Sequence, residues 1–209
     1  MLVQNVTISP IVRNVAEVRS LLEVNMRSNP SGLTGALTRP VFGDLLTFGI
    51  SALFENMEAL EKARDTAESN PKVQEYRAKI ESLIRQPIEL AVSEIVVPGA
   101  SDSSGRYRQL TQFFPVAGKH DEVQSILEEL AKSQQAAGRP NFSCVVRLFS
   151  SSGPIISVRD TYETLAEQEN VARQFTSSAA YTEIISKLPS LVRRPFSSGL
   201  RELIMPYGG

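Results

Sequence analysis

The chain has 209 residues, 42% of them hydrophobic, with 22 basic and 23 acidic side chains and a net charge of −1. This length suits one sizeable domain or two small packed halves, and the balanced charge argues against nucleic acid or anionic lipid as a partner. A single cysteine, Cys144, excludes an internal disulfide, and a single histidine argues against a transition metal held by the protein. We therefore expect no metal and no cofactor.

No segment has the length of a membrane span, and the first ten residues lack the basic region and the long apolar stretch of a signal peptide. The sequence therefore predicts a cytoplasmic protein that does not contact a membrane.

The first half of the chain predicts strands and helices in a defined order. Runs of β-formers indicate strands, and apolar residues at helical spacing indicate helices. The predicted elements are a strand at 3–8, a helix at 15–26, strands at 33–42 and 45–54 around Gly43-Asp44, a helical region at 57–83 divided at Asn70-Pro71, and a strand at 90–97.

The second half repeats this order. Its predicted elements are a strand at 110–116, a helix at 123–130, strands at 142–149 and 155–162, a helical region at 165–191 divided at Ser177-Ser178, and a strand at 200–205. Residues 15–98 recur without a gap as residues 123–206, at a spacing of 108. At the ends of the two units Arg85, Pro87, Glu94 and Pro98 are matched by Arg193, Pro195, Glu202 and Pro206.

A shared register over some eighty residues indicates two copies of one supersecondary unit. We expect a first repeat at residues 1–98, a flexible polar linker at 99–107 and a second repeat at 108–209. Each repeat has the ferredoxin-like order βαββαβ, in which helices cover one face of an antiparallel sheet. The other face needs a partner, which the second copy can supply.

In this arrangement the chain resembles the dimeric α+β barrel superfamily, which includes antibiotic-biosynthesis monooxygenases and NIPSNAP-type proteins. The segments Tyr162-Glu163-Thr164-Leu165 and Ser178-Ala179-Ala180-Tyr181 look most like NIPSNAP-type members. The predicted fold class is therefore α+β, with two tandem ferredoxin-like repeats whose antiparallel sheets join into one pseudo-dimeric α+β barrel. Further homo-oligomers are left open.

Three functions remain open, and so does the question whether the protein is an enzyme. The first is binding of a small organic molecule in a pocket of the barrel. The second is a cofactor-independent monooxygenase or isomerase reaction on a small aromatic or polyketide-like substrate. The third is a NIPSNAP-like interaction role without catalysis.

Strand alternation predicts a ligand-binding face. Thr47 and Ser51 in the first copy, and Ser157 and Arg159 in the second, alternate with large apolar residues that must pack on helices. The small side chains among these polar residues leave room for a ligand, and the alternative is a well-filled polar interface.

Two repeated charges predict structural ion pairs. Arg39 and Arg147 occupy one repeat position, and Glu94 and Glu202 occupy another, all on apolar strands where an unpaired charge is costly. We expect Arg39 to pair with Glu202, and Arg147 with Glu94, in a structural more than a catalytic role.

Residues found in only one copy are the better candidates for chemistry. His120, Arg159 and Asp160 meet this criterion and are the catalytic candidates. For His120, at the start of a predicted helix, the alternative is an exposed turn in which Asp121 caps the helix. Tyr162 and Tyr181 fall at apolar positions and are expected in the core.

Overall fold

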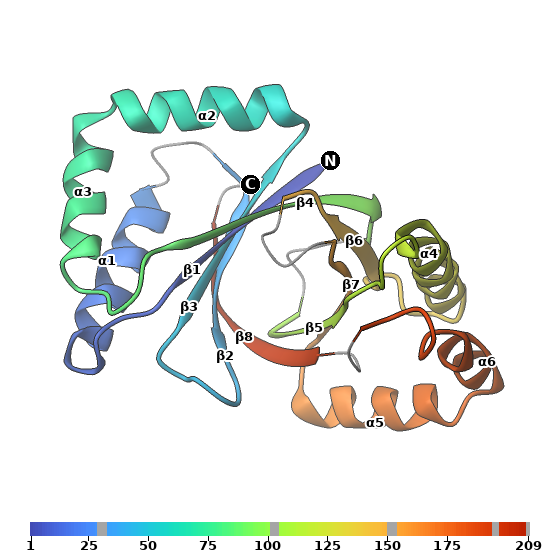
Figure 1. Ribbon diagram of the computed structural model, residues 1–209. Helices are drawn as coiled ribbons and strands as arrows, with labels where there is room; N and C mark the ends of the chain where they lie inside the picture. The colour runs from blue at the N-terminus through green and yellow to red at the C-terminus, as the bar shows by residue number, and fades with distance from the viewer. Residues whose placement is uncertain (29–32, 101–104, 150–153, 194–196, 208–209) are drawn as a thin grey trace. The chain divides into compact units, whose positions relative to one another are not determined.

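The computed structural model describes residues 1–28, 33–100, 105–149, 154–193 and 197–207 (Figure 1). Residues 101–104 of the predicted linker and Pro195 lie outside this range. Within it the elements are β1 (Leu2–Ile8), a 3-10 turn (Val12–Asn14), α1 (Val15–Ser28), β2 (Gly35–Pro40), β3 (Phe48–Phe54), α2 (Met57–Ser69), α3 (Pro71–Glu81), β4 (Glu89–Val97), β5 (Tyr107–Phe113), α4 (His120–Ala136), β6 (Ser143–Arg147), β7 (Ile156–Tyr162), α5 (Leu165–Thr176), α6 (Ala179–Lys187) and β8 (Ser197–Tyr207).

The strands are ordered β1-β3-β2-β8-β5-β7-β6-β4, and this order closes as an antiparallel barrel. The predicted α+β class is therefore confirmed. The chain divides into two compact units, one of Met1–Val92 with Glu202–Gly209 and one of Ser93–Arg201. Strands β4 and β8 each contribute residues to both units.

The repeat is visible in the strand register. Strands β3 and β7 begin 108 residues apart, as do β2 and β6, and β4 and β8. The first strands differ, because β1 and β5 begin 105 residues apart: Leu2 lies opposite Phe54, and Tyr107 lies opposite Tyr162. The predicted strand at 110–116 is therefore placed three residues too late.

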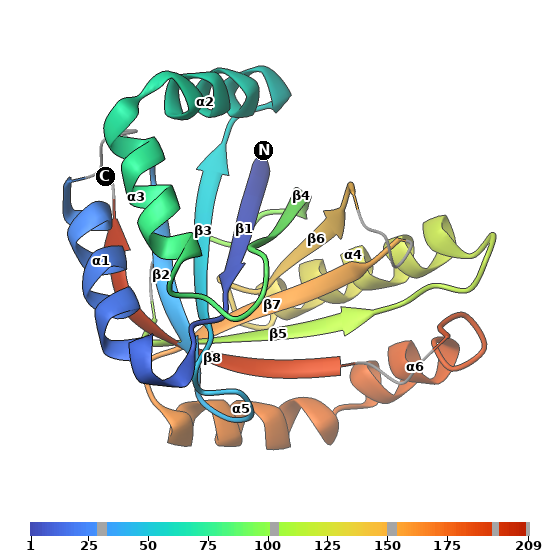
Figure 2. The ribbon, with the colours of Figure 1, turned by 60° about the vertical axis from the view of Figure 1, so that its left-hand side comes forward.

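The first unit has its core between a sheet and helices α1 and α3. Val18 and Leu22 of α1 and Ile80 of α3 pack against Leu37 and Phe48 of the strands. Helix α2 covers a smaller cluster near the end of β3, which contains the buried residues Leu2, Ala52 and Phe54. Figure 2 shows α1 and α3 on one side of β1, β3 and β2.

The second unit has the larger core cluster. Helix α4 contributes Val123, Leu127 and Leu130, α6 contributes Ile184, and Leu188 follows directly after α6. These side chains pack on the buried strand residues Phe113, Cys144, Val146, Ile156 and Val158. The apolar face of the sheet is thus covered by helices, as a half-buried antiparallel sheet requires.

The predicted divisions of the second helical regions are confirmed by their caps. Asn70 ends α2 and caps α3, where its side chain accepts from the Lys72 amide at 3.0 Å. Ser178 caps α6 in the same way, accepting from the Tyr181 amide at 3.1 Å. Such short polar side chains satisfy the open amides of a helix start. None of the described helices is both long enough and apolar enough to cross a membrane.

Candidate functional site

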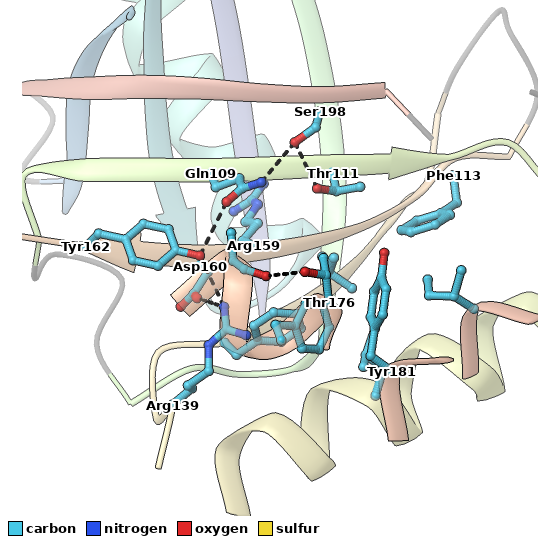
Figure 3. Close-up of a pocket in the computed structure, with 16 residues that line it drawn as sticks. Gln109, Thr111, Phe113, Arg139, Arg159, Asp160, Tyr162, Thr176, Tyr181 and Ser198 are labelled. Atoms are coloured by element: carbon cyan, nitrogen blue, oxygen red, sulfur yellow. Dashed lines mark hydrogen bonds and ion pairs between the residues drawn. The ribbon is translucent and has the colours of Figure 1, made fainter. Parts of the chain in front are cut away.

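A pocket of about 210 Å³ lies in the second unit, between strands β5 and β7 and helices α5 and α6 (Figure 3). One side is lined by aromatic and aliphatic side chains and the other by polar ones. Ser198 and Thr176 are exposed and mark its open side. The lining residues are Gln109, Thr111, Phe113, Leu130, Arg139, Phe142, Val158, Arg159, Asp160, Tyr162, Ala172, Phe175, Thr176, Tyr181, Ile185 and Ser198.

The apolar wall is built from three aromatic rings. The Phe175 ring lies 4.4 Å from the Tyr181 ring, tilted by 57°, and 6.3 Å from the Phe142 ring, tilted by 52°. Tilted ring pairs at these distances are favourable beyond their buried area. The wall therefore offers fixed aromatic surfaces to a ligand.

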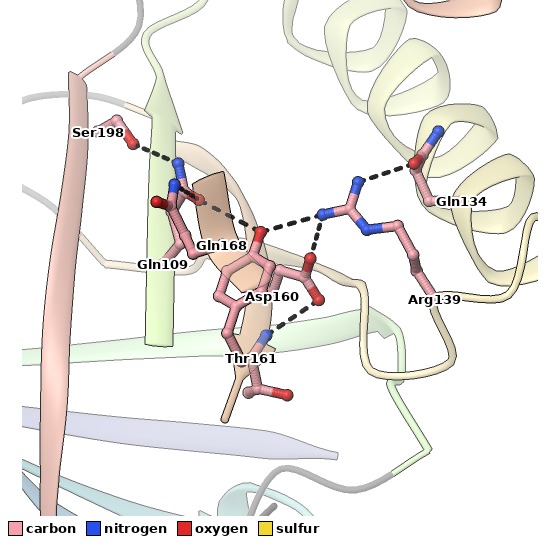
Figure 4. A network of polar contacts seen from close by, with 8 residues as sticks. Gln109, Gln134, Arg139, Asp160, Thr161, Gln168 and Ser198 are labelled. Atoms are coloured by element: carbon pink, nitrogen blue, oxygen red, sulfur yellow. Dashed lines mark hydrogen bonds and ion pairs between the residues drawn. The ribbon is translucent and has the colours of Figure 1, made fainter. Parts of the chain in front are cut away.

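Arg139 lies against this wall and also belongs to the network of polar contacts drawn in Figure 4. It follows the end of α4, where Gly138 has a φ of +91°, a conformation that favours glycine. The guanidinium carbon lies 4.8 Å from the Phe142 ring centre and 5.1 Å from that of Phe175. The same group donates to Gln134 at 2.8 Å.

Arg139 also forms a buried ion pair with Asp160 of β7. The side chains are 16% and 7% exposed, so solvent screens this pair little. The other carboxylate oxygen of Asp160 accepts from the Thr161 amide at 2.9 Å. Because buried charges are tolerated only when paired and hydrogen-bonded, these contacts explain how Asp160 is held inside the unit.

A chain of side-chain hydrogen bonds leads from this pair to the open side of the pocket. Arg139 donates to the Tyr162 hydroxyl at 3.1 Å, and that hydroxyl donates to Gln109 Oε1 at 3.3 Å. Gln109 Nε2 donates to Ser198 Oγ at 3.1 Å, and Ser198 lies 3.1 Å from the Thr111 hydroxyl. Burial is the main cause that raises the pKa of Tyr162, so its hydroxyl stays protonated.

Tyr181 approaches the pocket from the helical side. Figure 3 shows its hydroxyl end directed toward the strands, on the side where Phe113 lies. That hydroxyl makes no hydrogen bond to the residues that the structure describes. It is therefore available to a ligand.

The pocket differs most clearly from the first copy in its polar and aromatic residues. A residue of the second copy is matched to its equivalent in the first copy by subtracting 108 from its number, or 105 if it lies in β5. Asp160, Tyr162, Thr111, Ser198, Phe175 and Tyr181 correspond to Ala52, Phe54, Val6, Leu90, Ala67 and Val73. The polar chain is thus a property of the second repeat.

Of the four predicted ligand-binding residues, two belong to the first unit and two to the second. Thr47 lies just before β3, and its hydroxyl donates to the Asp44 carbonyl at 3.1 Å. Ser51 lies within β3, and its backbone carbonyl accepts a hydrogen bond from the Tyr207 hydroxyl. Ser157 is buried in β7 opposite Val145. Among these four residues, Arg159 alone lines the pocket.

The structure brings Arg39 and Glu202 together within the first unit, where Arg39 Nη2 lies 2.6 Å from Glu202 Oε2. Arg147 and Glu94 lie on the neighbouring strands β6 and β4, where Glu94 is opposite Val146 and Arg147 is opposite Ser93. Their ion pair stays a prediction.

Among the catalytic candidates, Arg159 and Asp160 line the pocket and His120 does not. His120 is the first residue of α4, and its Nδ1 lies 3.1 Å from an Asp121 carboxylate oxygen. The expectation that Asp121 caps this helix is wrong, because Lys119 holds the cap position without a side-chain hydrogen bond. In the described residues no cluster of histidine, cysteine and acidic side chains could hold a metal ion.

Sequence reasoning missed Gln109 and Arg139, and it placed Tyr162 and Tyr181 in the core. Tyr162 is indeed buried, but it also takes part in the polar chain. A systematic comparison of the two copies along β7 and α6 would have identified both tyrosines, because phenylalanine and valine replace them in the first copy.

No protein-family model matches the chain, and no curated protein matches it in sequence. Solved structures are similar to its whole length. A provisionally assigned monooxygenase from Fusobacterium nucleatum has a TM-score of 0.74 at 8% identity, covering 99% of this chain and 94% of that one. An anthrone oxidase-like protein has a TM-score of 0.70 at 13% identity, covering 98% and 91%.

A NIPSNAP family protein from Agrobacterium tumefaciens is similar to 47% of this chain and 93% of its own, at 12% identity and a TM-score of 0.40. At 8% and 13% identity, the likeness to the two full-length structures shows the fold alone, which is that of the dimeric α+β barrel proteins. The resemblance inferred from the sequence is confirmed at this level.

Proposed function

We propose that the second unit binds a small, oxygen-bearing aromatic molecule in the pocket between β5, β7, α5 and α6. The observation that carries this proposal is the combination of an aromatic wall with a polar chain that faces it. Pockets of this kind, mostly apolar with a few placed polar groups, are typical ligand sites.

The volume of the pocket limits the size of the ligand. An apolar cavity of about 150 Å³ holds a benzene molecule. A pocket of about 210 Å³ therefore suits a molecule of one or two rings. Phe142, Phe175 and Tyr181 supply ring faces against which such a molecule can stack.

The charges in the pocket favour binding over acid–base catalysis. Asp160 is committed to Arg139, and Tyr162 is held in its protonated form. No histidine, lysine or cysteine is among the residues that line this pocket. A general base with a free proton-accepting atom is therefore missing from this lining.

Oxygenation of the bound aromatic molecule is the second candidate. It is supported by the names of two proteins with the same fold, a provisionally assigned monooxygenase and an anthrone oxidase-like protein. In such a reaction dioxygen would be the oxidant: one oxygen atom would convert a ring CH2 group into a carbonyl, and the two hydrogens of that group would leave with the other oxygen atom as water. The product would thus gain one oxygen atom and lose two hydrogens. Mass spectrometry of bound ligands after incubation in air would detect this gain.

Binding is tested by saturation-transfer NMR with a library of one-ring and two-ring aromatic molecules. Ala172 lines the pocket, so Ala172→Trp should fill it and abolish the signals. Arg64 occupies the same position in the first copy and its side chain is 73% exposed, so Arg64→Trp is a matched control. Equal binding by wild-type protein and Ala172→Trp would place the ligand elsewhere and contradict the proposal.

A further inference from the structure

We infer that the pocket selects aromatic ligands that present a hydrogen-bond acceptor oxygen to Thr111, Ser198 and Tyr181. This inference rests on the proposed function and names the chemical group by which the ligand would be recognised. It follows from the direction of the hydrogen bonds along the polar wall.

Arg139, at the buried end of this chain of hydrogen bonds, determines which group donates and which accepts in each bond. A guanidinium group has only donors and does not lose its proton in proteins, so the Tyr162 oxygen must accept at 3.1 Å. The Tyr162 hydrogen is then directed to Gln109 Oε1 at 3.3 Å. Gln168 Nε2 donates to the same oxygen, also at 3.3 Å.

Two donors on Gln109 Oε1 orient the whole amide group. Its NH₂ faces Ser198, to which it donates at 3.1 Å. The Ser198 Oγ and Thr111 Oγ1 atoms lie 3.1 Å apart, and either hydroxyl can be the donor between them. Whichever of the two hydroxyls donates to the other, the second hydroxyl keeps a hydrogen that is not used between them. That hydrogen can be donated to a ligand.

Tyr181 adds a second unused donor from the helical side, since its hydroxyl has no partner in the described part of the chain. The strong acceptors of the polar wall are engaged, because both Asp160 oxygens and Gln109 Oε1 already accept hydrogen bonds. The wall therefore has donors in surplus. A ring carbonyl or phenolic oxygen would satisfy them, whereas a plain hydrocarbon would leave them unpaired.

The test compares indan-1-one with indane, two probes of nearly the same shape of which only the first has an acceptor oxygen. The dissociation constants are measured by ligand-observed NMR. Wild-type protein should bind indan-1-one about fivefold more tightly, as one net hydrogen bond of about 1 kcal/mol implies. Thr111→Val combined with Ser198→Ala and Tyr181→Phe removes all three donors and should bring this ratio close to one while indane binding is retained.

Thr176→Val is the matched control. Thr176 also lines the pocket, but its hydroxyl already donates to the Ala172 carbonyl at 2.9 Å, so this variant should keep the wild-type ratio. Equal binding of both probes by the wild-type protein would overturn the inference and leave the proposed function intact. If neither probe binds, both proposals fail for two-ring ligands.

Discussion

Asp160 in β7 and Ala52 in β3 occupy the same position of the two repeats, and each lies opposite a glutamine. Asp160 faces Gln109, and Ala52 faces Gln4. The first copy thus shows that this strand position does not need a charge to fold. The carboxylate in the second copy is an addition that requires Arg139 as its partner.

Replacing Arg139 should destabilise the protein through the charge that it leaves behind. Arg139→Met leaves Asp160 buried and unpaired, with an expected loss of about 3–5 kcal/mol in the free energy of unfolding. The double variant Arg139→Met/Asp160→Ala should recover at least half of this loss, since alanine occupies the equivalent position in the first copy. Urea unfolding followed by circular dichroism measures both, and additive losses would contradict the ion pair.

Removing the Tyr76 hydroxyl should stabilise the first unit. This hydroxyl is buried and has no hydrogen-bond partner among the described residues, and burial raises its pKa. Tyr76→Phe should therefore add about 1 kcal/mol to the free energy of unfolding. Tyr207→Phe is the opposite case, because the Tyr207 hydroxyl donates to the Ser51 carbonyl at 2.6 Å. Tyr207→Phe should lower the free energy of unfolding by about 1 kcal/mol. Equal effects of Tyr76→Phe and Tyr207→Phe on this free energy would refute the explanation.

Gly35 is required by close packing at the start of β2. A Cβ atom there would collide with the Ser51 carbonyl oxygen and lie 2.5 Å from the Tyr207 hydroxyl oxygen. Gly35→Ala should destabilise the protein by about 2–3 kcal/mol. At Gly199 a Cβ atom would meet nothing within 4 Å, so Gly199→Ala should change stability by less than about 0.5 kcal/mol. Thermal unfolding of the two variants gives the comparison.

Cys144 should be unreactive in the folded protein. It is fully buried, and burial, with a smaller contribution from Glu128, raises the pKa of its thiol to about 12. The thiol therefore stays protonated at pH 8, and the thiolate is the reactive form. Iodoacetamide should modify it in urea but not in buffer, as mass spectrometry would show. Rapid labelling of the native protein would indicate that this core opens readily.

Much of the fold was predictable because the repeat supplies each element twice. The caps Asn70 and Ser178 have distinct local signatures, and both helix divisions are where the sequence placed them. The start of β5 was misplaced because the first strands and the first helices of the two copies begin 105 residues apart, and the spacing becomes 108 only from β2 and β6 onward. The gapless register predicted from residue 15 is therefore wrong over the first helix. Helix α4 has 17 residues and α1 has 14, and the three extra residues are close to one helical turn, so the hydrophobic periodicity is almost unchanged.

The pocket was predictable only in part. Arg159 and Asp160 stood out as residues of one copy, and both line it. The expected binding face was the side of the strand that bears Thr47 and Ser51, whereas the pocket opens beside the helices. Arg139 lies in a turn, 21 residues before its partner Asp160, and nothing in the local sequence indicates that contact. Long-range partners of loop residues depend on tertiary packing.

Ligand binding in the second unit is tested most directly by two-dimensional ¹H–¹⁵N NMR of the protein titrated with indan-1-one. The amides that shift should cluster in the stretches that line the pocket, at 109–113, 139–142, 158–162 and 172–185. The same titration of Ala172→Trp should leave these amides unmoved. Shifts concentrated in residues 1–92, or undiminished shifts in Ala172→Trp, would contradict binding in this pocket.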